Sequence, residues 1–204
     1  MIGIIDYGMG NLMSVQNSLD YLGEKNLICD KPADLKKVNK IILPGVGAFP
    51  DCISNLKKRG LMDSLNYLVK VKEVPILGIC LGMQVMATIG HESKKTEGFG
   101  WFDAEVIPLI SKNKNEKIPN IGWENIDFSS ESVLFNGFLN KPDFYFVHSY
   151  FMKCNQDSDL KSWYYFGDEK ITASIQKNHI FGTQFHPEKS SDFGREVLIN
   201  FIDY

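Results

Sequence analysis

One cysteine stands in a pattern that could make it a nucleophile. Cys80 lies within residues 78–82 (Gly-Ile-Cys-Leu-Gly), after the apolar run 75–79 and before the apolar segment 83–89. Glycines two residues to either side of a nucleophile are typical of a sharp strand-to-helix turn at the carboxyl edge of a sheet. The partial positive charge of the following helix favours a thiolate over a thiol. The backbone N–H of Leu81 is then placed to donate to an oxyanion.

A thiol nucleophile needs a base, and the base needs a third group that holds its tautomer. His186 follows the apolar segment 180–185 and therefore lies at a sheet edge. Glu188, two residues further on, can accept a hydrogen bond from the imidazole. Cys80, His186 and Glu188 thus form a candidate triad in chain order. The competing base is His148, although its place inside an apolar strand favours a structural histidine.

A glycine-containing loop could complete such a site. The loop 44–47 (Pro-Gly-Val-Gly) follows the apolar strand 40–43 and should share the carboxyl edge with Cys80. The glycines on either side of Val46 permit a peptide flip, which could present a second N–H to a tetrahedral intermediate. The alternatives are a plain strand-to-helix turn and a phosphate cradle, and no Lys-Ser/Thr pair follows to support the cradle.

The other three cysteines stand in no such context, and we expect Cys29, Cys52 and Cys154 to be small buried hydrophobic residues. The same structural interpretation is the alternative for Cys80. None of the four forms a CxxC pair or lies beside a histidine at metal-ligand spacing. We therefore expect no disulfide framework, no metal and no cofactor, and a reducing compartment.

The elements that position these motifs alternate in the first half of the chain. Short apolar runs predict strands, and apolar residues at helical spacing predict helices. The predicted strands are 2–5, 26–29, 40–43 and 75–79, and the predicted helices are 10–22, 48–71 with an interruption near Gly60, and 83–89. The segment 83–89 is apolar on all sides, which is typical of a buried helix. Alternation of this kind indicates βαβ units and a parallel sheet.

The second half of the chain is rich in strands. Those predicted are 102–109, 121–128, 143–150, 162–166, 171–176 and 180–185, with residues 111–117 as a solvated hairpin tip or loop and 190–202 as a surface helix. We expect one α/β domain over residues 1–204. Its fold would be a flavodoxin-like open sheet, mostly parallel, with helices on both faces and a β-rich second half.

Composition excludes several classes of protein. The chain has 204 residues, 44% of them hydrophobic and 12% aromatic, and a net charge of −3. The absence of a basic block argues against a nucleic-acid partner, and the aromatic content argues against disorder. The longest uncharged run, 74–90, is short for a membrane span of ~20 residues. Residues 1–6 have no basic residue and end at Asp6, so they do not predict a signal peptide. We therefore expect a cytoplasmic protein without a membrane partner.

Together the motifs resemble the class I, or triad, glutamine amidotransferases. Within that class the chain is most similar to the HisH family, the glutaminase subunits of imidazole glycerol phosphate synthases. The motifs that carry the resemblance are 6–12 (DYGMGNL), 44–47 (PGVG), 78–84 (GICLGMQ), 122–123 (GW), 145–150 (YFVHSY) and 184–190 (QFHPEKS). They span most of the chain, and Pro-Gly-Val-Gly in place of the Pro-Gly-Gly of related glutaminases is the feature that indicates HisH.

The resemblance implies hydrolysis of glutamine to glutamate and ammonia, with Cys80 as nucleophile, His186 as proton relay and Glu188 as its orienter. The oxyanion would be held by the N–H of Leu81 and by the loop of Gly45, Val46 and Gly47. Binding of the amino-acid end of glutamine would fall to four residues: Gln84, Glu92, and the backbone of Ser149 and Tyr150.

The resemblance also implies a partner. Members of the HisH family pass ammonia to HisF, a (β/α)₈ barrel cyclase, and form a heterodimer with it. Free ammonia is protonated in water, so a shielded route between subunits makes chemical sense. Four residues match family positions at or near that interface: Asn11, Trp123, Tyr145 and Lys189.

One motif departs from the family pattern. Where the family usually reads Pro-His-Met-Gly-Trp-Asn, residues 119–124 read Pro-Asn-Ile-Gly-Trp-Glu. HisH-like paralogues exist that supply ammonia for amination or amidination of surface-glycan sugars, and this departure leaves that pathway open beside histidine biosynthesis. The alternative functions from other classes of protein are a Cys–His peptidase or deglycase of similar fold and a non-catalytic binding module.

Overall fold

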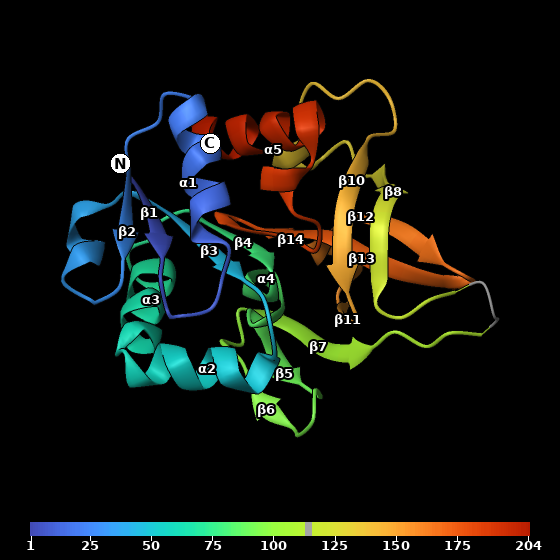
Figure 1. Cartoon of the computed structure of the whole chain (residues 1–204), viewed down its shortest axis with the longest axis horizontal. Helices are drawn as coiled ribbons and strands as arrows, with labels where there is room; N and C mark the ends of the chain where they lie inside the picture. Colours follow the sequence, from blue (N-terminus) through green and yellow to red (C-terminus); the bar gives the residue numbers. More distant parts are fainter. Residues whose placement is uncertain (113–115) are drawn as a thin grey trace.

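An eight-stranded sheet runs through the centre of the molecule (Figure 1). The structure, a computed structural model, describes residues 1–112 and 116–204. Five neighbouring strands of the sheet are parallel, in the order β2 (Asn26–Cys29), β1 (Ile2–Ile5), β3 (Lys40–Gly45), β4 (Ile76–Cys80) and β14 (Ile180–Thr183). Most residues of the central strands are buried on both faces, as expected for parallel strands covered by helices.

The rest of the sheet is antiparallel and comes from the second half of the chain. It continues from β14 through β13 (Glu169–Lys177), β12 (Leu160–Phe166) and β9 (Asp127–Phe128). Two smaller sheets flank it. One pairs β10 (Asp143–His148) with β8 (Asn120–Asn125), and the other has the order β11 (Tyr150–Cys154), β7 (Phe102–Pro108), β5 (Ala87–Gly90) and β6 (Thr96–Glu97). The expected α/β architecture with a β-rich second half is confirmed.

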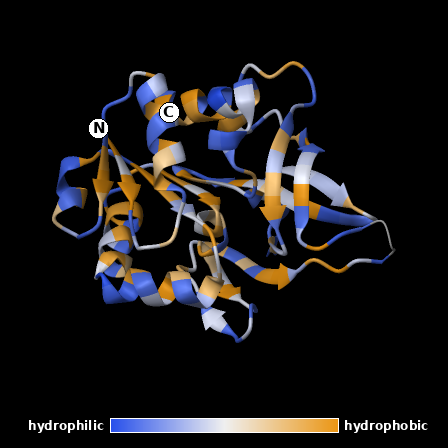
Figure 2. Cartoon of the chain, in the orientation of Figure 1, coloured by the Kyte–Doolittle hydropathy of each residue, from blue (hydrophilic) through white to orange (hydrophobic). Residues whose placement is uncertain are grey.

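Helices cover both faces of the parallel strands. On one face lie α1 (Leu12–Tyr21) and α5 (Ser191–Asp203), and on the other lie α2 (Phe49–Lys58) and α3 (Leu61–Lys70). Short 3₁₀ helices are η1 (Asp34–Lys37), η2 (Val133–Phe135), η3 (Asp157–Asp159) and η4 (Pro187–Lys189). The central parallel strands are among the most hydrophobic parts of the chain, and the helices turn polar residues outward (Figure 2). No helix within residues 1–112 and 116–204 is long and apolar enough to cross a membrane.

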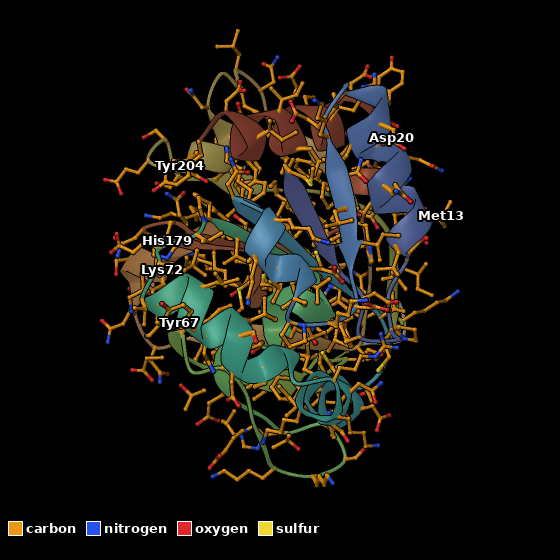
Figure 3. The ribbon with its side chains drawn as sticks, turned by 90° about the vertical axis from the view of Figure 1, so that its left-hand side faces the viewer. Met13, Asp20, Tyr67, Lys72, His179 and Tyr204 are labelled. Atoms are coloured by element: carbon orange, nitrogen blue, oxygen red, sulfur yellow. The ribbon has the colours of Figure 1, made fainter. Side chains whose placement is uncertain are left out.

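Alternating side chains of the strands divide the core into two layers. Ile4 packs with the apolar residues of α1 and α5, whereas its neighbour Ile5 packs with those of α2 and α3. On the solvent side, Met13 and Asp20 project outward from α1 (Figure 3). At the far end of α3, His179 Nε2 lies 2.8 Å from the carbonyl oxygen of Val69, which ties the turn between β13 and β14 to this helix.

Three sequence predictions were wrong. The segment 83–89 is not a helix: α4 spans only Leu81–Gln84, and β5 begins at Ala87. Its residues are buried because the small sheet of β5 and β7 packs there, and an apolar run suits a buried strand as well as a buried helix. The predicted strand 143–150 is divided at Ser149 into β10 and β11, which pair in different sheets. The predicted strand 121–128 is likewise divided at Ile126 into β8 and β9, which pair with β10 and β12. In the predicted tip 111–117, residues 113–115 lie outside the described residues.

The junction of β3, β4 and α4 leaves no room for a side chain at Gly82. A Cβ atom there would lie 1.7 Å from the carbonyl oxygen of Leu43. We expect Gly82→Ala to lower the free energy of unfolding by about 3 kcal/mol or more, measured by urea denaturation. The matched control is Gly100→Ala, where a Cβ meets nothing within 4 Å and only the positive φ of 65° is unfavourable; it should cost about 1–2 kcal/mol. Equal losses in the two variants would contradict the steric argument.

Candidate active site

Cys80 occupies the predicted sharp turn at the end of β4. Its φ of 54° and ψ of −110° are unfavourable for a side chain, and it directly precedes the first residue of α4. Glycines make this turn possible, because a Cβ atom at Gly78 would lie 2.6 Å from the carbonyl oxygen of Gly82. Cys80 is paired with Gly45 of β3 in the sheet register. The strand edge therefore carries the cysteine and the predicted oxyanion loop side by side.

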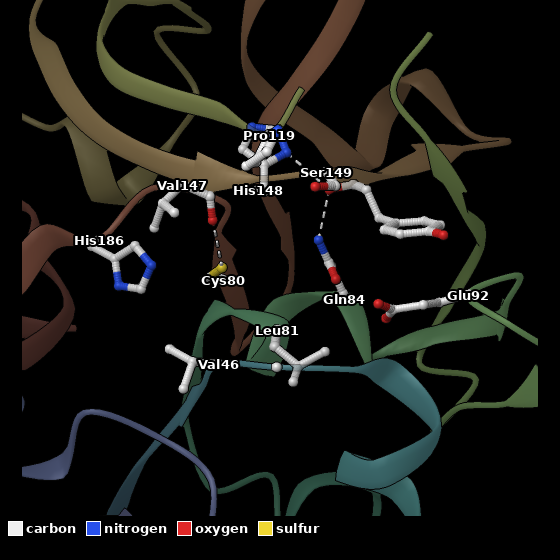
Figure 4. Close-up of a pocket in the computed structure, with 12 residues that line it drawn as sticks. Val46, Cys80, Leu81, Gln84, Glu92, Pro119, Val147, His148, Ser149 and His186 are labelled. Carbon is white, nitrogen blue, oxygen red and sulfur yellow. Dashed lines mark hydrogen bonds between the residues drawn. The ribbon is translucent and has the colours of Figure 1, made fainter. Parts of the chain in front are cut away.

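Two groups approach the Cys80 sulfur. Gln184 Nε2 lies 3.5 Å from Sγ and can donate to it, and the carbonyl oxygen of Val147 lies 3.9 Å from Sγ (Figure 4). Gln184 is fully buried at the end of β14. Sequence reasoning missed its proximity to the nucleophile. The only signal was its position in a strand that ends beside β4, two residues before the predicted base.

His186 and Glu188 form a buried pair. His186 Nδ1 lies 2.8 Å from Glu188 Oε1, and both side chains are only 2% exposed. Burial alone would lower the pKa of His186, but interactions with Cys80 and Glu188 outweigh it and raise that pKa to about 10. Within the described part of the chain, His186 Nε2 has no hydrogen-bond partner. This nitrogen is therefore the one left to exchange a proton with a substrate.

The structure disfavours His148 as the base. Its Nδ1 lies 2.8 Å from the carbonyl oxygen of Tyr150, and its Nε2 lies 2.9 Å from the hydroxyl of Tyr164. Burial is the main cause that lowers the pKa of His148 to about 4, and the nearby His186 lowers it further. A neutral imidazole with both nitrogens engaged cannot readily accept a proton from Cys80.

A pocket of about 260 Å³ opens over the cysteine. Figure 4 shows His186 on one side of Cys80, and Gln84 and Glu92 on the other. Twelve residues line the pocket: Val46, Gly47, Cys80, Leu81, Gln84, Glu92, Pro119, Val147, His148, Ser149, Tyr150 and His186. The triad candidates Cys80 and His186 thus share one cavity with all four residues predicted to bind the amino-acid end of glutamine.

Two of those four residues are held by specific hydrogen bonds. Gln84 Nε2 donates to the carbonyl oxygen of Tyr150 at 2.8 Å and to Gln184 Oε1 at 2.9 Å, so what Gln84 can offer a ligand is its own carbonyl oxygen. Glu92 follows β5 rather than a helix end. Its Oε2 accepts from the backbone N–H of Phe49 at 2.7 Å, which caps the N-terminus of α2 and anchors the carboxylate beside the pocket.

The predicted oxyanion loop starts at the end of β3, with Gly45 as the last residue of the strand. Val46 is 42% exposed, and Gly47 has a φ of 98° that favours glycine. Gly45 beneath it is tightly enclosed, because a Cβ atom there would lie 2.4 Å from the Tyr7 hydroxyl and 2.9 Å from Leu81 Cβ. Burial strongly raises the pKa of Tyr7, so its hydroxyl stays neutral below the loop.

Three of the four residues predicted at a partner interface form one surface cluster. Trp123 is 49% exposed, its ring lies edge-on to Tyr145 at 6.2 Å between centroids, and Lys189 Nζ lies 5.8 Å from the Tyr145 ring. Asn11 instead accepts from the N–H of Ser14 at 3.4 Å and caps α1. Within residues 1–112 and 116–204, no three His, Cys, Asp or Glu side chains are grouped to hold a metal ion.

The four cysteines should differ in reactivity. Iodoacetamide near pH 7 should alkylate Cys80 first, because Cys80 lines the open pocket that His186 also lines. Burial raises the pKa of Cys29 to about 11 and those of Cys52 and Cys154 to about 12, so these thiols stay protonated. Mass-spectrometric peptide mapping measures the order of labelling. Cys80→Ala should abolish the fast phase, and faster labelling of another cysteine would refute the expectation.

Comparison with known proteins agrees with the geometry. The chain is 45% identical to imidazole glycerol phosphate synthase subunit HisH 1 of Campylobacter jejuni over 99% of each chain. It is 42% identical to subunit HisH of Lactococcus lactis, covering 99% of this chain and 98% of the relative. A crystal structure of a glutamine amidotransferase has the same fold, with a TM-score of 0.78 and 16% identity over 99% of this chain and 97% of the other.

A family comparison covers almost the whole sequence. The model of the family described as glutamine amidotransferase class-I matches residues 3–203, which include the cysteine turn, the loop after β3 and the His186–Glu188 pair. The chain therefore belongs to the class-I glutamine amidotransferase family.

Proposed function

We propose that this chain is the glutaminase subunit of an imidazole glycerol phosphate synthase, and that residues 1–204 act as one glutamine amidotransferase domain. The observation that carries the proposal is the buried His186–Glu188 pair, 2.8 Å apart, in the pocket of a cysteine held at a positive φ. The names of the full-length relatives, 45% and 42% identical, support the pathway.

The first half of the reaction is acylation. The Cys80 thiolate attacks the side-chain amide carbon of glutamine, forming a C–S bond and a tetrahedral oxyanion. The imidazolium of His186 gives the proton on Nε2 to the amide nitrogen, and the C–N bond breaks to release ammonia. Glu188 accepts from Nδ1 and holds the ring in the required orientation. The product on the enzyme is a thioester.

The second half is hydrolysis of the thioester. The now neutral His186 removes a proton from water, whose oxygen attacks the thioester carbon. The C–S bond then breaks, glutamate leaves, and the original thiolate–imidazolium pair is restored. In both halves the oxyanion is held by the N–H of Leu81 and by an N–H of the loop of Gly45, Val46 and Gly47.

Binding of glutamine uses the polar end of the pocket. Gln84, Glu92, and the backbone of Ser149 and Tyr150 line it and offer mainly acceptor oxygens. Such oxygens suit the α-ammonium group, while backbone N–H groups suit the α-carboxylate. The pocket thereby selects an amino acid and directs its side-chain amide toward Cys80.

Ammonia passes to a partner subunit, a HisF-like (β/α)₈ barrel that forms a heterodimer with this chain. The exposed cluster of Trp123, Tyr145 and Lys189, together with Asn11, is the docking surface we propose. Trp123 and Tyr145 supply apolar area with polar tips, and aromatic residues of this kind are enriched at protein interfaces.

The proposed nucleophile can be tested directly. Cys80→Ala should reduce glutamate release from glutamine, in the presence of a HisF-like barrel, by ~10³-fold or more, because no thioester can form. A coupled glutamate dehydrogenase assay measures the rate. Cys154→Ala is the matched control and should retain activity, since Cys154 lies outside the pocket. Substantial turnover by Cys80→Ala would refute the mechanism.

The second test concerns the partner. Because the loop glycines allow an N–H orientation that does not face the oxyanion, the isolated chain should hydrolyse glutamine slowly and respond steeply to partner and acceptor binding. Glutamate release is compared for the chain alone, with a barrel, and with barrel plus acceptor. A full rate without partner would overturn this expectation. Identification of the barrel that co-purifies separates histidine biosynthesis from the glycan-amination alternative.

A further inference from the structure

A chain of hydrogen bonds leads from Asn120 on β8 to the wall of the pocket. Asn120 Nδ2 lies 3.0 Å from the hydroxyl of Tyr164 on β12, and that hydroxyl lies 2.9 Å from His148 Nε2. His148 Nδ1 in turn lies 2.8 Å from the carbonyl oxygen of Tyr150. The three side chains are almost fully enclosed, with exposed fractions of 8% for Asn120, 2% for Tyr164 and 6% for His148.

The chemistry of these groups fixes which atom donates and which accepts in each hydrogen bond. An amide nitrogen only donates, so the Tyr164 oxygen accepts from Asn120 and uses its own hydrogen toward His148 Nε2. His148 must then carry its proton on Nδ1, where it donates to Tyr150. Each donor in the chain is matched by an acceptor. Removal of the Asn120 amide or the Tyr164 hydroxyl would leave a buried polar atom unpaired.

The series of hydrogen bonds continues from Tyr150 to the proposed nucleophile. The carbonyl oxygen of Tyr150 accepts a second hydrogen bond from Gln84 Nε2 at 2.8 Å. Gln84 Nε2 also donates to Gln184 Oε1, and Gln184 Nε2 lies 3.5 Å from Cys80 Sγ. Tyr150 and Gln84 both line the pocket. The buried hydrogen bonds therefore orient two groups that a bound substrate would contact.

We propose that Asn120, Tyr164 and His148 are positioning residues that fix the Tyr150 carbonyl and the Gln84 amide, and thereby determine the affinity for the amino-acid end of the substrate. This inference rests on the proposed function, because it assumes that the pocket binds glutamine. None of the three side chains needs to take a proton from the reaction. Their effect passes through the wall residues that they hold.

Residue 120 needs a hydrogen-bond donor rather than one particular side chain. The family resemblance leads us to expect a histidine here, and this chain has Asn120 instead. The side chain points into the molecule and donates to Tyr164, a task that an imidazole N–H can also perform. The departure at this position is therefore an exchange of one buried donor for another. A residue without a donor should behave differently from histidine.

The test compares Asn120→His, Asn120→Leu and Tyr164→Phe in complex with a HisF-like barrel. We expect Asn120→Leu and Tyr164→Phe to raise KM for glutamine ~10-fold with a smaller change in kcat, because a buried hydrogen bond that holds the wall is lost. Asn120→His, which keeps a donor at this position, should leave KM within ~3-fold of the parent value. Tyr165→Phe, on the exposed neighbour of Tyr164, is the matched control and should leave KM unchanged.

A second measurement is independent of turnover. Calorimetric binding of glutamine to the Cys80→Ala chain should weaken ~10-fold when Asn120→Leu is added and recover with Asn120→His. Iodoacetamide labelling of Cys80 in Asn120→Leu should stay at the parent rate, which separates loss of the wall from misfolding. Unchanged KM and binding in Asn120→Leu and Tyr164→Phe would overturn the inference. A parent chain that neither binds nor hydrolyses glutamine would instead overturn the proposed function.

Discussion

The backbone conformation of Cys80 is the constraint on which the site depends. A side chain at φ 54° and ψ −110° is stable only where surrounding structure holds it, and here the surroundings are backbone atoms in close contact. A Cβ atom at Gly82 would lie 1.7 Å from the carbonyl oxygen of Leu43, and one at Gly78 would lie 2.6 Å from the carbonyl oxygen of Gly82. The packing of β3, β4 and α4, whose residues are almost all buried, stabilises this strained turn. A thiol on a flexible loop would lack both the fixed orientation and the adjacent N–H of Leu81.

Charge is organised around that fixed sulfur. His186 is removed from water, which by itself would lower its pKa, yet interactions with Cys80 and Glu188 reverse this effect and raise its pKa to about 10. His148, about as buried but without an anionic partner, is shifted the other way, to about 4. Two histidines in one pocket therefore differ in protonation because of their partners. In the proposed mechanism His186 exchanges protons, whereas His148 positions the pocket wall.

Much of this arrangement could be predicted because it depends on local sequence. The glycines around Cys80, the spacing of His186 and Glu188, and the apolar runs before them each specify a turn or a strand end. The segment 83–89 was mispredicted because an apolar run does not distinguish a buried strand from a buried helix. Gln184 and the Asn120–Tyr164–His148 chain were missed for a different reason. Their partners lie far away in sequence, and only strand pairing brings them together.

The pairing of β8 with β10 gives the departure at 119–124 a structural meaning. Asn120 is paired with His148 and Trp123 with Tyr145, and side chains three residues apart on a strand point to opposite faces. Asn120 is 8% exposed and Trp123 49%, so one face of this ribbon is enclosed beside the pocket wall while the other is open to solvent. A substitution at 120 acts on the buried face, whereas one at Ile121, which is 59% exposed, acts on the outer face. Residues 120 and 121 therefore differ in physical kind: the Asn120 side chain is enclosed beside His148, whereas the Ile121 side chain is open to solvent, so a substitution at each position acts through different contacts.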